Sequence, residues 1–291
     1  MRHSRGFTLI ELLVAMVIML IVAGSIYTLL NTTQRVSRAQ AERVDLQSNV
    51  RAGSIVVPNE LRELNNVEGA LAGPQVDILG TPSDTKLQYR AMRGIGFVCE
   101  VPTTGLVKIL KSTWSGLRDP VAVRDAGYVF LEGADPDVST DDGWQTVLIT
   151  NVSTSTCVAA NDAWAFTISP AVAALTAVPV PVGTPVRLYE VMELSLYANG
   201  GKSWLGARSV SGLEASPQPV LGPLVDGTGL VFKYLDKTGV QTALMSNVKS
   251  IRLTIHGITD HAIVKGGSSG AVQQVDDSLV SEVLLRNAFR P

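Results

Sequence analysis

A single carboxylate lies inside the apolar segment near the amino terminus, and it is the residue there that could do chemistry. Residues 7–30 read FTLIELLVAMVIMLIVAGSIYTLL, in which Glu11 is the one charged residue. A carboxylate at the centre of a bilayer costs about 2.5 to 3.5 kcal/mol on insertion scales. We therefore expect Glu11 to have a specific role that offsets this cost.

Two other clusters have the residue types of metal ligands. The acidic run ADPDVSTDDG places Thr140 where an EF-hand loop needs glycine, and no glutamate follows at the twelfth position. We expect a solvated acidic loop from Asp135 to Asp142 rather than a calcium site. His256, Asp260 and His261 are close in sequence, but positions 256 and 261 of a strand point to opposite faces. A joint metal site there would need a turn between the two histidines, and we expect no metal site.

Composition and motifs exclude several classes of function. The 291 residues carry 24 Lys and Arg against 26 Asp and Glu, a net charge of −2. The chain therefore lacks the basic excess with which proteins neutralise nucleic-acid phosphates. It has no glycine-rich phosphate loop after a strand and no HExxH sequence. We expect no enzyme, no cofactor and no nucleic-acid partner.

The apolar segment needs a helix long enough to cross a membrane. At 1.5 Å per residue, residues 7–30 would extend about 36 Å, against about 30 Å of hydrocarbon. The preceding MRHSRG carries Arg2 and Arg5, and the positive-inside rule places this end in the cytoplasm. We predict a single-pass membrane protein whose larger, carboxy-terminal part is exported.

Two ordinary interpretations compete for this segment. It could be a plain signal anchor, or a secretory signal peptide cleaved near Ala23-Gly24-Ser25, where small residues follow the apolar stretch. Neither interpretation gives the Glu11 carboxylate a role.

A third interpretation comes from a family resemblance. The residues GFTLIELLVAMVIML, 6–20, resemble the type III signal of type IV prepilins and type II secretion pseudopilins. The resemblance implies that a prepilin peptidase cuts between Gly6 and Phe7 and methylates the new Phe7 amine. Residues 1–6 would then be a leader, and residues 7–30 would stay as a transmembrane and polymerisation helix. The implied partners are other pilins, minor pilins or pseudopilins, an inner-membrane assembly platform and membrane lipid.

Physical chemistry gives each of these positions a role. Gly6 offers no side chain to obstruct a peptidase. Glu11 lies about 6 Å along the helix from the Phe7 nitrogen, close to the positive end of the helix dipole. In a filament of staggered subunits, Glu11 can pair with the Phe7 ammonium of a neighbour, and apolar surroundings strengthen that ion pair while desolvation opposes it.

The helical pattern continues beyond the apolar segment, over residues 31–65. One apolar stripe recurs at helical spacing and comprises Leu46, Val50, Val57, Leu61 and Leu64. We expect this face to pack against a globular head. Gly53 and Pro58 weaken the pattern, and we expect a kink or a restart of the helix near Pro58.

Residues 66–291 have the texture of an exported, β-rich head. Short apolar runs alternate with turn residues, which favours antiparallel strands. The predicted strands are 86–90, 96–101, 127–132, 145–150, 164–169, 186–198, 203–210, 229–236, 248–258 and 278–287. The fold class is therefore α+β, with a long amino-terminal helix packed on a predominantly antiparallel sheet, as in pilins.

This half of the chain also carries a weaker resemblance. Residues 186–197, 230–239, 248–255 and 285–287 look like the carboxy-terminal half of PilW-type minor pilins, which are understood to prime or cap a type IV pilus. J-type pseudopilins of type II secretion share the signal and a β-rich head, and remain the alternative. A third hypothesis is a membrane-anchored periplasmic enzyme or adhesive domain that only borrows the signal.

The two cysteines, Cys99 and Cys157, both fall in the predicted exported part. Thiols oxidise outside the cytoplasm, so we expect a disulfide between them rather than two buried free thiols. In the chain-entropy model, closing that loop stabilises the fold by about 4 kcal/mol. Two cysteines are too few for a zinc cluster.

Overall fold

One long helix leads into a large antiparallel sheet. The computed structural model describes residues 8–69, 73–133, 135, 137–138, 142–171, 180–264 and 271–286. Helix α1 (Leu9–Arg62) runs through Pro58 without ending, so the helix does not restart there. Val57 and Leu61, on either side of this proline, are buried. Packing of these neighbours outweighs the one hydrogen bond that proline removes close to the helix end.

The chain divides into two compact units. The first unit comprises Met1–Ser48 and Ile258–Asp277, and the second comprises Asn49–Gly257 and Ser278–Pro291. In the first unit, strand β15 (Ile263–Val264) pairs antiparallel with β16 (Val272–Gln273). The backbone of Thr259 donates to Val275 O at 2.8 Å. Both contacts join the two ends of the segment Ile258–Asp277.

Most strands lie in the second unit. The other strands are β1 (Asn66–Gly69), β2 (Gly73–Val76), β3 (Ile78–Leu79), β4 (Lys86–Phe97), β5 (Leu106–Leu110), β6 (Ser115–Gly116), β7 (Asp125–Leu131), β8 (Gly143–Thr156), β9 (Asp162–Ser169), β10 (Pro185–Asn199), β11 (Lys202–Ser209), β12 (Gln218–Leu224), β13 (Leu230–Leu235), β14 (Ser250–Ile258) and β17 (Asp276–Leu284). Three short 3₁₀ helices are described at Lys111–Thr113, Val158–Ala160 and Met245–Asn247. Among the described residues, 13 strands form one sheet with the path β13-β14-β12-β11-β10-β7-β8-β9-β5, to which β17, β3, β4 and β6 add.

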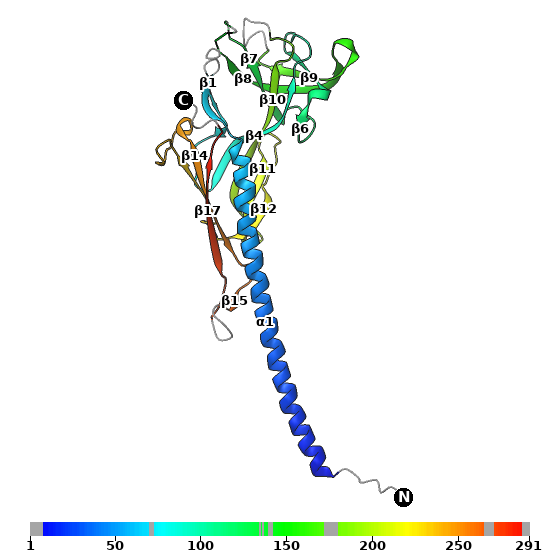
Figure 1. Ribbon diagram of the computed structural model, residues 1–291, viewed down its shortest axis with the longest axis vertical. Helices are drawn as coiled ribbons and strands as arrows, with labels where there is room; N and C mark the ends of the chain where they lie inside the picture. The colour runs from blue at the N-terminus through cyan, green and yellow to red at the C-terminus, as the bar shows by residue number, and fades with distance from the viewer. Residues whose placement is uncertain are drawn as a thin grey trace. The chain divides into compact units, whose positions relative to one another are not determined.

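Strand β10 is the centre of this sheet (Figure 1). One edge pairs with β4 along residues 185–195. The other edge pairs first with β7, over residues 186–190, and then with β11, over residues 192–199. A single long strand therefore joins two groups of strands, and each group encloses its own apolar core.

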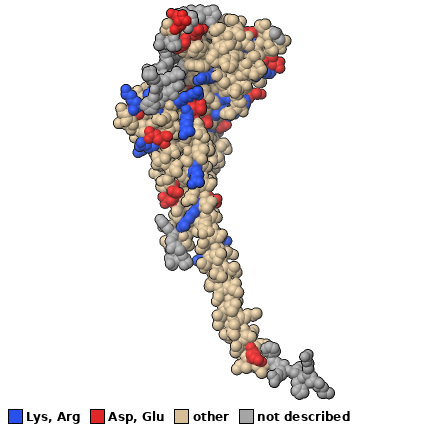
Figure 2. Space-filling view, viewed as in Figure 1, with Lys and Arg blue, Asp and Glu red and all other residues tan. Residues whose placement is uncertain are grey.

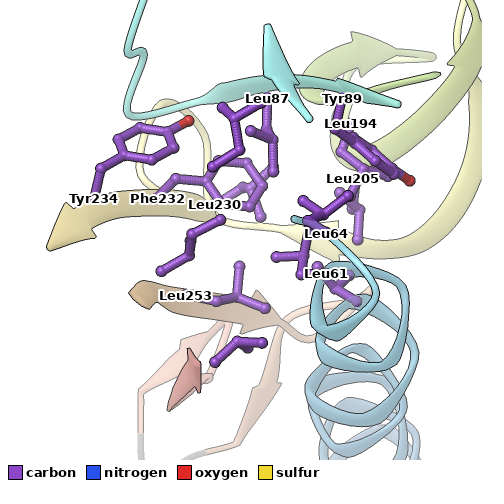
Figure 3. Packing of buried hydrophobic residues seen from close by; sticks show 14 of the residues in the cluster. Leu61, Leu64, Leu87, Tyr89, Leu194, Leu205, Leu230, Phe232, Tyr234 and Leu253 are labelled. Carbon is purple, nitrogen blue, oxygen red and sulfur yellow. The ribbon is translucent and has the colours of Figure 1, made fainter. Parts of the chain in front are cut away.

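The larger core receives the end of α1. Val57, Leu61 and Leu64 are buried against leucines and aromatic residues of β4, β10, β11, β13 and β14. Figure 3 shows Leu61 and Leu64 directed toward these strands. The expected apolar stripe is confirmed, because Leu46, Val50, Val57 and Leu61 of α1 and Leu64, two residues beyond its end, are all buried. Gly53 belongs to the same contact, since a Cβ there would lie 2.5 Å from the Leu221 side chain.

The second core is made by β5, β7, β8, β9 and the first half of β10. Its residues include Ile109, Val129, Phe166 and Leu188, each almost fully buried. The inward positions alternate along each strand, as expected for a half-buried sheet. This core contains no residue of α1.

Most predicted strands are present, but one is wrong. The run at 96–101 is not a separate strand, because β4 ends at Phe97 and Val98 makes only an isolated bridge to Ile109. Strands β5 and β12 were not predicted, nor were the shorter strands β1, β2, β3, β6, β15 and β16. The helix and the large antiparallel sheet are consistent with the α+β class.

Candidate functional site

The amino-terminal part of α1 presents an uncovered apolar surface. Every residue from Thr8 to Leu30 is exposed, including Leu9 at 80% and Leu20 at 72%. A window of this helix has a mean hydropathy of 2.7, and none of it is buried. Figure 2 shows this length of helix without charged groups on the visible face, apart from one acidic group near its amino-terminal end. By length and composition, this segment can cross a membrane.

The single acid of this segment forms a helix cap. The Thr8 backbone N–H and Oγ1 each lie 3.1 Å from Glu11 Oε2, and the Glu11 backbone N–H donates to Thr8 Oγ1 at 3.4 Å. This reciprocal pair is a capping box, which satisfies amide groups that have no partner inside the helix. The sequence signal was available, since Thr8 and Glu11 have the spacing that defines such a box.

Among the described residues, the Glu11 carboxylate uses only one of its two oxygens. Both of its hydrogen bonds go to Oε2, and Oε1 has no hydrogen bond and no ion pair within the same residues. Gly6 and Phe7 lie outside the described residues, so the predicted cleavage bond and amine have no geometry here. The helix continues unbroken through Ala23-Gly24-Ser25, where Ser25 Oγ donates to Ile21 O at 2.9 Å.

The two cysteines are joined in the structure. Cys99 and Cys157 form a disulfide with Cα atoms 5.9 Å apart and are 58 positions apart in sequence. The bond links the chain after β4 to the chain after β8. The chain after β4 also contacts β5, because the Cys99 backbone N–H donates to Lys108 O at 3.0 Å.

The acidic loop uses its carboxylates on its own backbone. Asp142 Oδ1 accepts from Gly133 N at 2.9 Å, and Asp135 Oδ1 accepts from Asp137 N at 3.1 Å. Asp141 lies outside the described residues. The described part of the chain contains no group of three or more His, Cys, Asp or Glu residues that could hold a metal ion.

The histidine cluster divides between different environments. His261 Nδ1 lies 2.8 Å from Glu42 Oε1 and 3.5 Å from Asp260 Oδ2, all in the first unit. The Glu42 carboxylate also accepts from the His261 backbone N–H at 3.2 Å. His256 belongs to strand β14 in the second unit. The contact of His261 with Glu42 therefore joins the segment Ile258–Asp277 to α1 within the first unit.

A buried carboxylate organises the centre of β10. Glu190 is 2% exposed and accepts from Arg93 Nε at 2.8 Å, Arg118 Nη2 at 3.1 Å and Arg124 Nε at 2.6 Å. Ser209 Oγ donates to the same carboxylate. Burial raises the pKa of Glu190, but hydrogen bonds from Ser209 and the three arginines outweigh it and hold the pKa at about 2.

A second buried carboxylate lies three residues along the strand. Glu193 accepts from Lys86 Nζ at 2.7 Å, Gln88 Nε2 at 2.6 Å and Arg208 Nε at 2.8 Å. Burial raises the pKa of Glu193, but the hydrogen bonds from these donors outweigh it and hold the pKa at about 2. Sequence reasoning missed both residues, because a glutamate in a strand carries no signal of its distant arginine partners.

The comparisons with known proteins address the amino terminus alone. A family model described as the prokaryotic N-terminal methylation motif matches residues 1–27. Searches of curated proteins and of solved structures find no match. The motif supports a type IV prepilin-like protein, a pilin-like or pseudopilin subunit. Such a motif implies processing by a prepilin peptidase and assembly with other pilins, and with the apolar helix it suggests membrane anchoring.

Proposed function

We propose that this chain is a minor pilin, a structural subunit that assembles through α1 into a type IV pilus in a priming or tip role. The observation that carries the proposal is the overlap of the methylation motif, at residues 1–27, with a helix that is exposed and predominantly apolar from Leu9 to Leu30. Its function is assembly by packing, with no substrate turnover.

Processing would prepare the helix for extraction from the membrane. Hydrolysis of the Gly6–Phe7 bond removes residues 1–6, which include Arg2 and Arg5. Those arginines anchor the segment on the cytoplasmic side. Methylation of the new Phe7 amine leaves it cationic. The head would lie in the periplasm before assembly and at the cell surface afterwards, and a disulfide between Cys99 and Cys157 suits both compartments.

Assembly would then bring a second apolar helix against the exposed one. Lipid tails are as apolar as leucine, so packing and polar contacts rather than the hydrophobic effect favour helix association within the bilayer. Glu11 supplies the polar contact. Its Oε2 stays in the capping box with Thr8, and its Oε1 can accept from the Phe7 ammonium of a neighbouring subunit. The cap therefore orients the carboxylate for this contact.

Two substitutions separate the ion pair from the cap. Glu11→Gln keeps an oxygen that can accept from Thr8 but removes the charge, whereas Thr8→Ala keeps the charge but removes the cap hydroxyl. We expect Glu11→Gln to reduce incorporation into sheared filaments at least tenfold with unchanged membrane levels. Thr8→Ala should stay within about threefold of the unchanged chain. Equal incorporation of Glu11→Gln and the unchanged chain would contradict the ion-pair role.

The choice of filament needs a separate test, because pseudopilins share the signal. Deletion of the gene should abolish or shorten surface pili while protein secretion through the outer membrane continues. Complementation with the unchanged chain should restore the pili, and complementation with Glu11→Gln should not. Loss of secretion with normal pili would instead assign the chain to a type II secretion filament.

A further inference from the structure

The second unit contains an open pocket of about 590 Å³ that none of the roles above uses. Strands β4, β6 and β10 line it, together with the chain just before β1, Asp77 between β2 and β3, Leu117 after β6, and Arg286 two residues after β17. Three of its lining residues are arginines, Arg93, Arg187 and Arg286, and two are acids, Glu63 and Asp77. A pocket with this lining is a candidate for a charged ligand.

Four of these five charges already have partners. Arg93 Nε lies 2.8 Å from Glu190 Oε2, and Arg286 Nη1 lies 3.1 Å from Glu63 Oε2. Asp77 is buried and accepts from Tyr128 OH at 2.8 Å and from Asn65 N at 2.7 Å. Arg187 is the remaining charge.

Among the described residues, Arg187 is a half-buried cation with no counter-charge in contact. It lies on β10 opposite Tyr128 on one side and Ile95 on the other. Its guanidinium carbon lies 4.5 Å from the centroid of the Trp144 ring. Within the described residues, the guanidinium has no hydrogen bond and no ion pair. Burial, and then the nearby Arg286, lower the pKa of Arg187, and the more distant charges of Asp77 and Glu63, which raise it, do not outweigh them.

These observations point to an anion. A cation that is removed from water without a partner is costly, and a bound oxyanion would offset that cost. The guanidinium groups of Arg187 and Arg286 repel each other, and an anion bound between them would attract both. Their planar donors match the oxygens of carboxylate and phosphate groups.

We propose that this pocket binds the carboxylate or phosphate group of a small molecule, with Arg187 as the principal contact and Arg286 as the second. The Ser115 hydroxyl, also in the lining, can donate a further hydrogen bond. The apolar side chains of Met92, Ile95 and Leu117 line the same pocket and would contact the carbon skeleton that carries the anion. The site is independent of the proposed assembly function, because it uses no residue of α1.

Calorimetric titration of the full chain in detergent micelles tests the site. The probes are inorganic phosphate, glucuronate as a carboxylate on a polar body, and glucose as its neutral counterpart. We expect saturable binding of phosphate or glucuronate, and none of glucose. Binding of phosphate alone would assign a phosphate ligand, and binding of glucuronate alone would assign a carboxylate.

Three variants make the test specific. Arg187→Gln should weaken binding at least tenfold, and Arg286→Gln about threefold. Arg252→Gln is the matched control, because Arg252 pairs with Glu282 at 3.0 Å and is exposed to a similar degree as Arg286. It should bind like the unchanged chain. If Arg187→Gln fails to fold, as near-ultraviolet circular dichroism would show, Arg286→Gln carries the test.

Three results would overturn the proposal. The first is the absence of binding for both anions. The second is equal weakening of binding by Arg286→Gln and Arg252→Gln, because a general ionic effect would not distinguish the pocket from another surface. The third is glucose binding as tightly as glucuronate, which would remove the role of the arginines.

Discussion

The amino-terminal part of α1 and the sheet of the second unit distribute their residues in opposite ways. From Thr8 to Leu30 the helix exposes large apolar side chains, whereas the sheet buries charged ones, Glu190 and Glu193 among them. Each arrangement is costly for a chain in water unless a partner compensates for it.

The difference lies in where the partner is. The buried glutamates find arginine and lysine partners within the same unit. The exposed apolar helix has no covering surface in the described part of the chain, and we expect lipid or other subunits to cover it. The buried charges of the sheet are therefore paired within its own unit, whereas the proposed function supplies the cover of the helix from outside the chain.

The largest expected effect comes from removing a buried charge. Glu190→Gln leaves Arg93, Arg118 and Arg124 around a neutral side chain, which should lower the free energy of unfolding by about 4 kcal/mol. Denaturant unfolding of the chain in detergent measures this. The control is Glu282→Gln, whose exposed pair with Arg252 should contribute less than about 1 kcal/mol. Similar losses for both variants would mean that the buried charges do not hold the sheet together.

A pair of leucines on the same helix compares the two regions directly. Leu61 is 0% exposed in the larger core and Leu13 is 55% exposed. Leu61→Ala should lower the free energy of unfolding by about 3 kcal/mol through lost burial and a cavity. Leu13→Ala should change it by less than about 0.5 kcal/mol. A destabilising Leu13→Ala would show that the apolar helix already packs within its own chain.

Acid should act on the sheet through the buried glutamates. Their pKa values of about 2 lie below the usual value of 4.5, so their contribution to stability is complete above pH 4.5 and is lost as the pH falls toward 2. By pH 3 each should have lost about 2 kcal/mol. Asp77 acts in the opposite direction, because burial raises its pKa. Unfolding curves from pH 6 to 3 measure the net change in the free energy of unfolding. Glu193→Gln should make that free energy depend less on pH. A pH-independent stability would contradict the network.

Sequence patterns predicted the features that depend on local periodicity. The apolar stripe of α1 repeats at helical spacing, and its five residues are buried as expected. The alternating strands 145–150 and 164–169 lie within β8 and β9. Glu11 was identified from its contrast with its neighbours, although its cap with Thr8 was overlooked.

Features that depend on distant register were not predictable. Strand β12 contains Pro219 and Pro223, which argue against a strand in a single sequence. The arginine partners of Glu190 come from positions 66 to 97 residues away. Arg187 lies between β4 and β7 because β10 pairs with both strands. No local pattern encodes such pairings.

The account rests on retention of the apolar helix in the mature, assembled protein. The most direct test is intact-mass and amino-terminal peptide analysis of the chain recovered from filaments sheared off the cell surface. We predict a chain that begins at an N-methylated Phe7 and retains residues 7–30. A chain that begins at Met1 or near Ser25, or that is absent from the sheared filaments, would contradict the account.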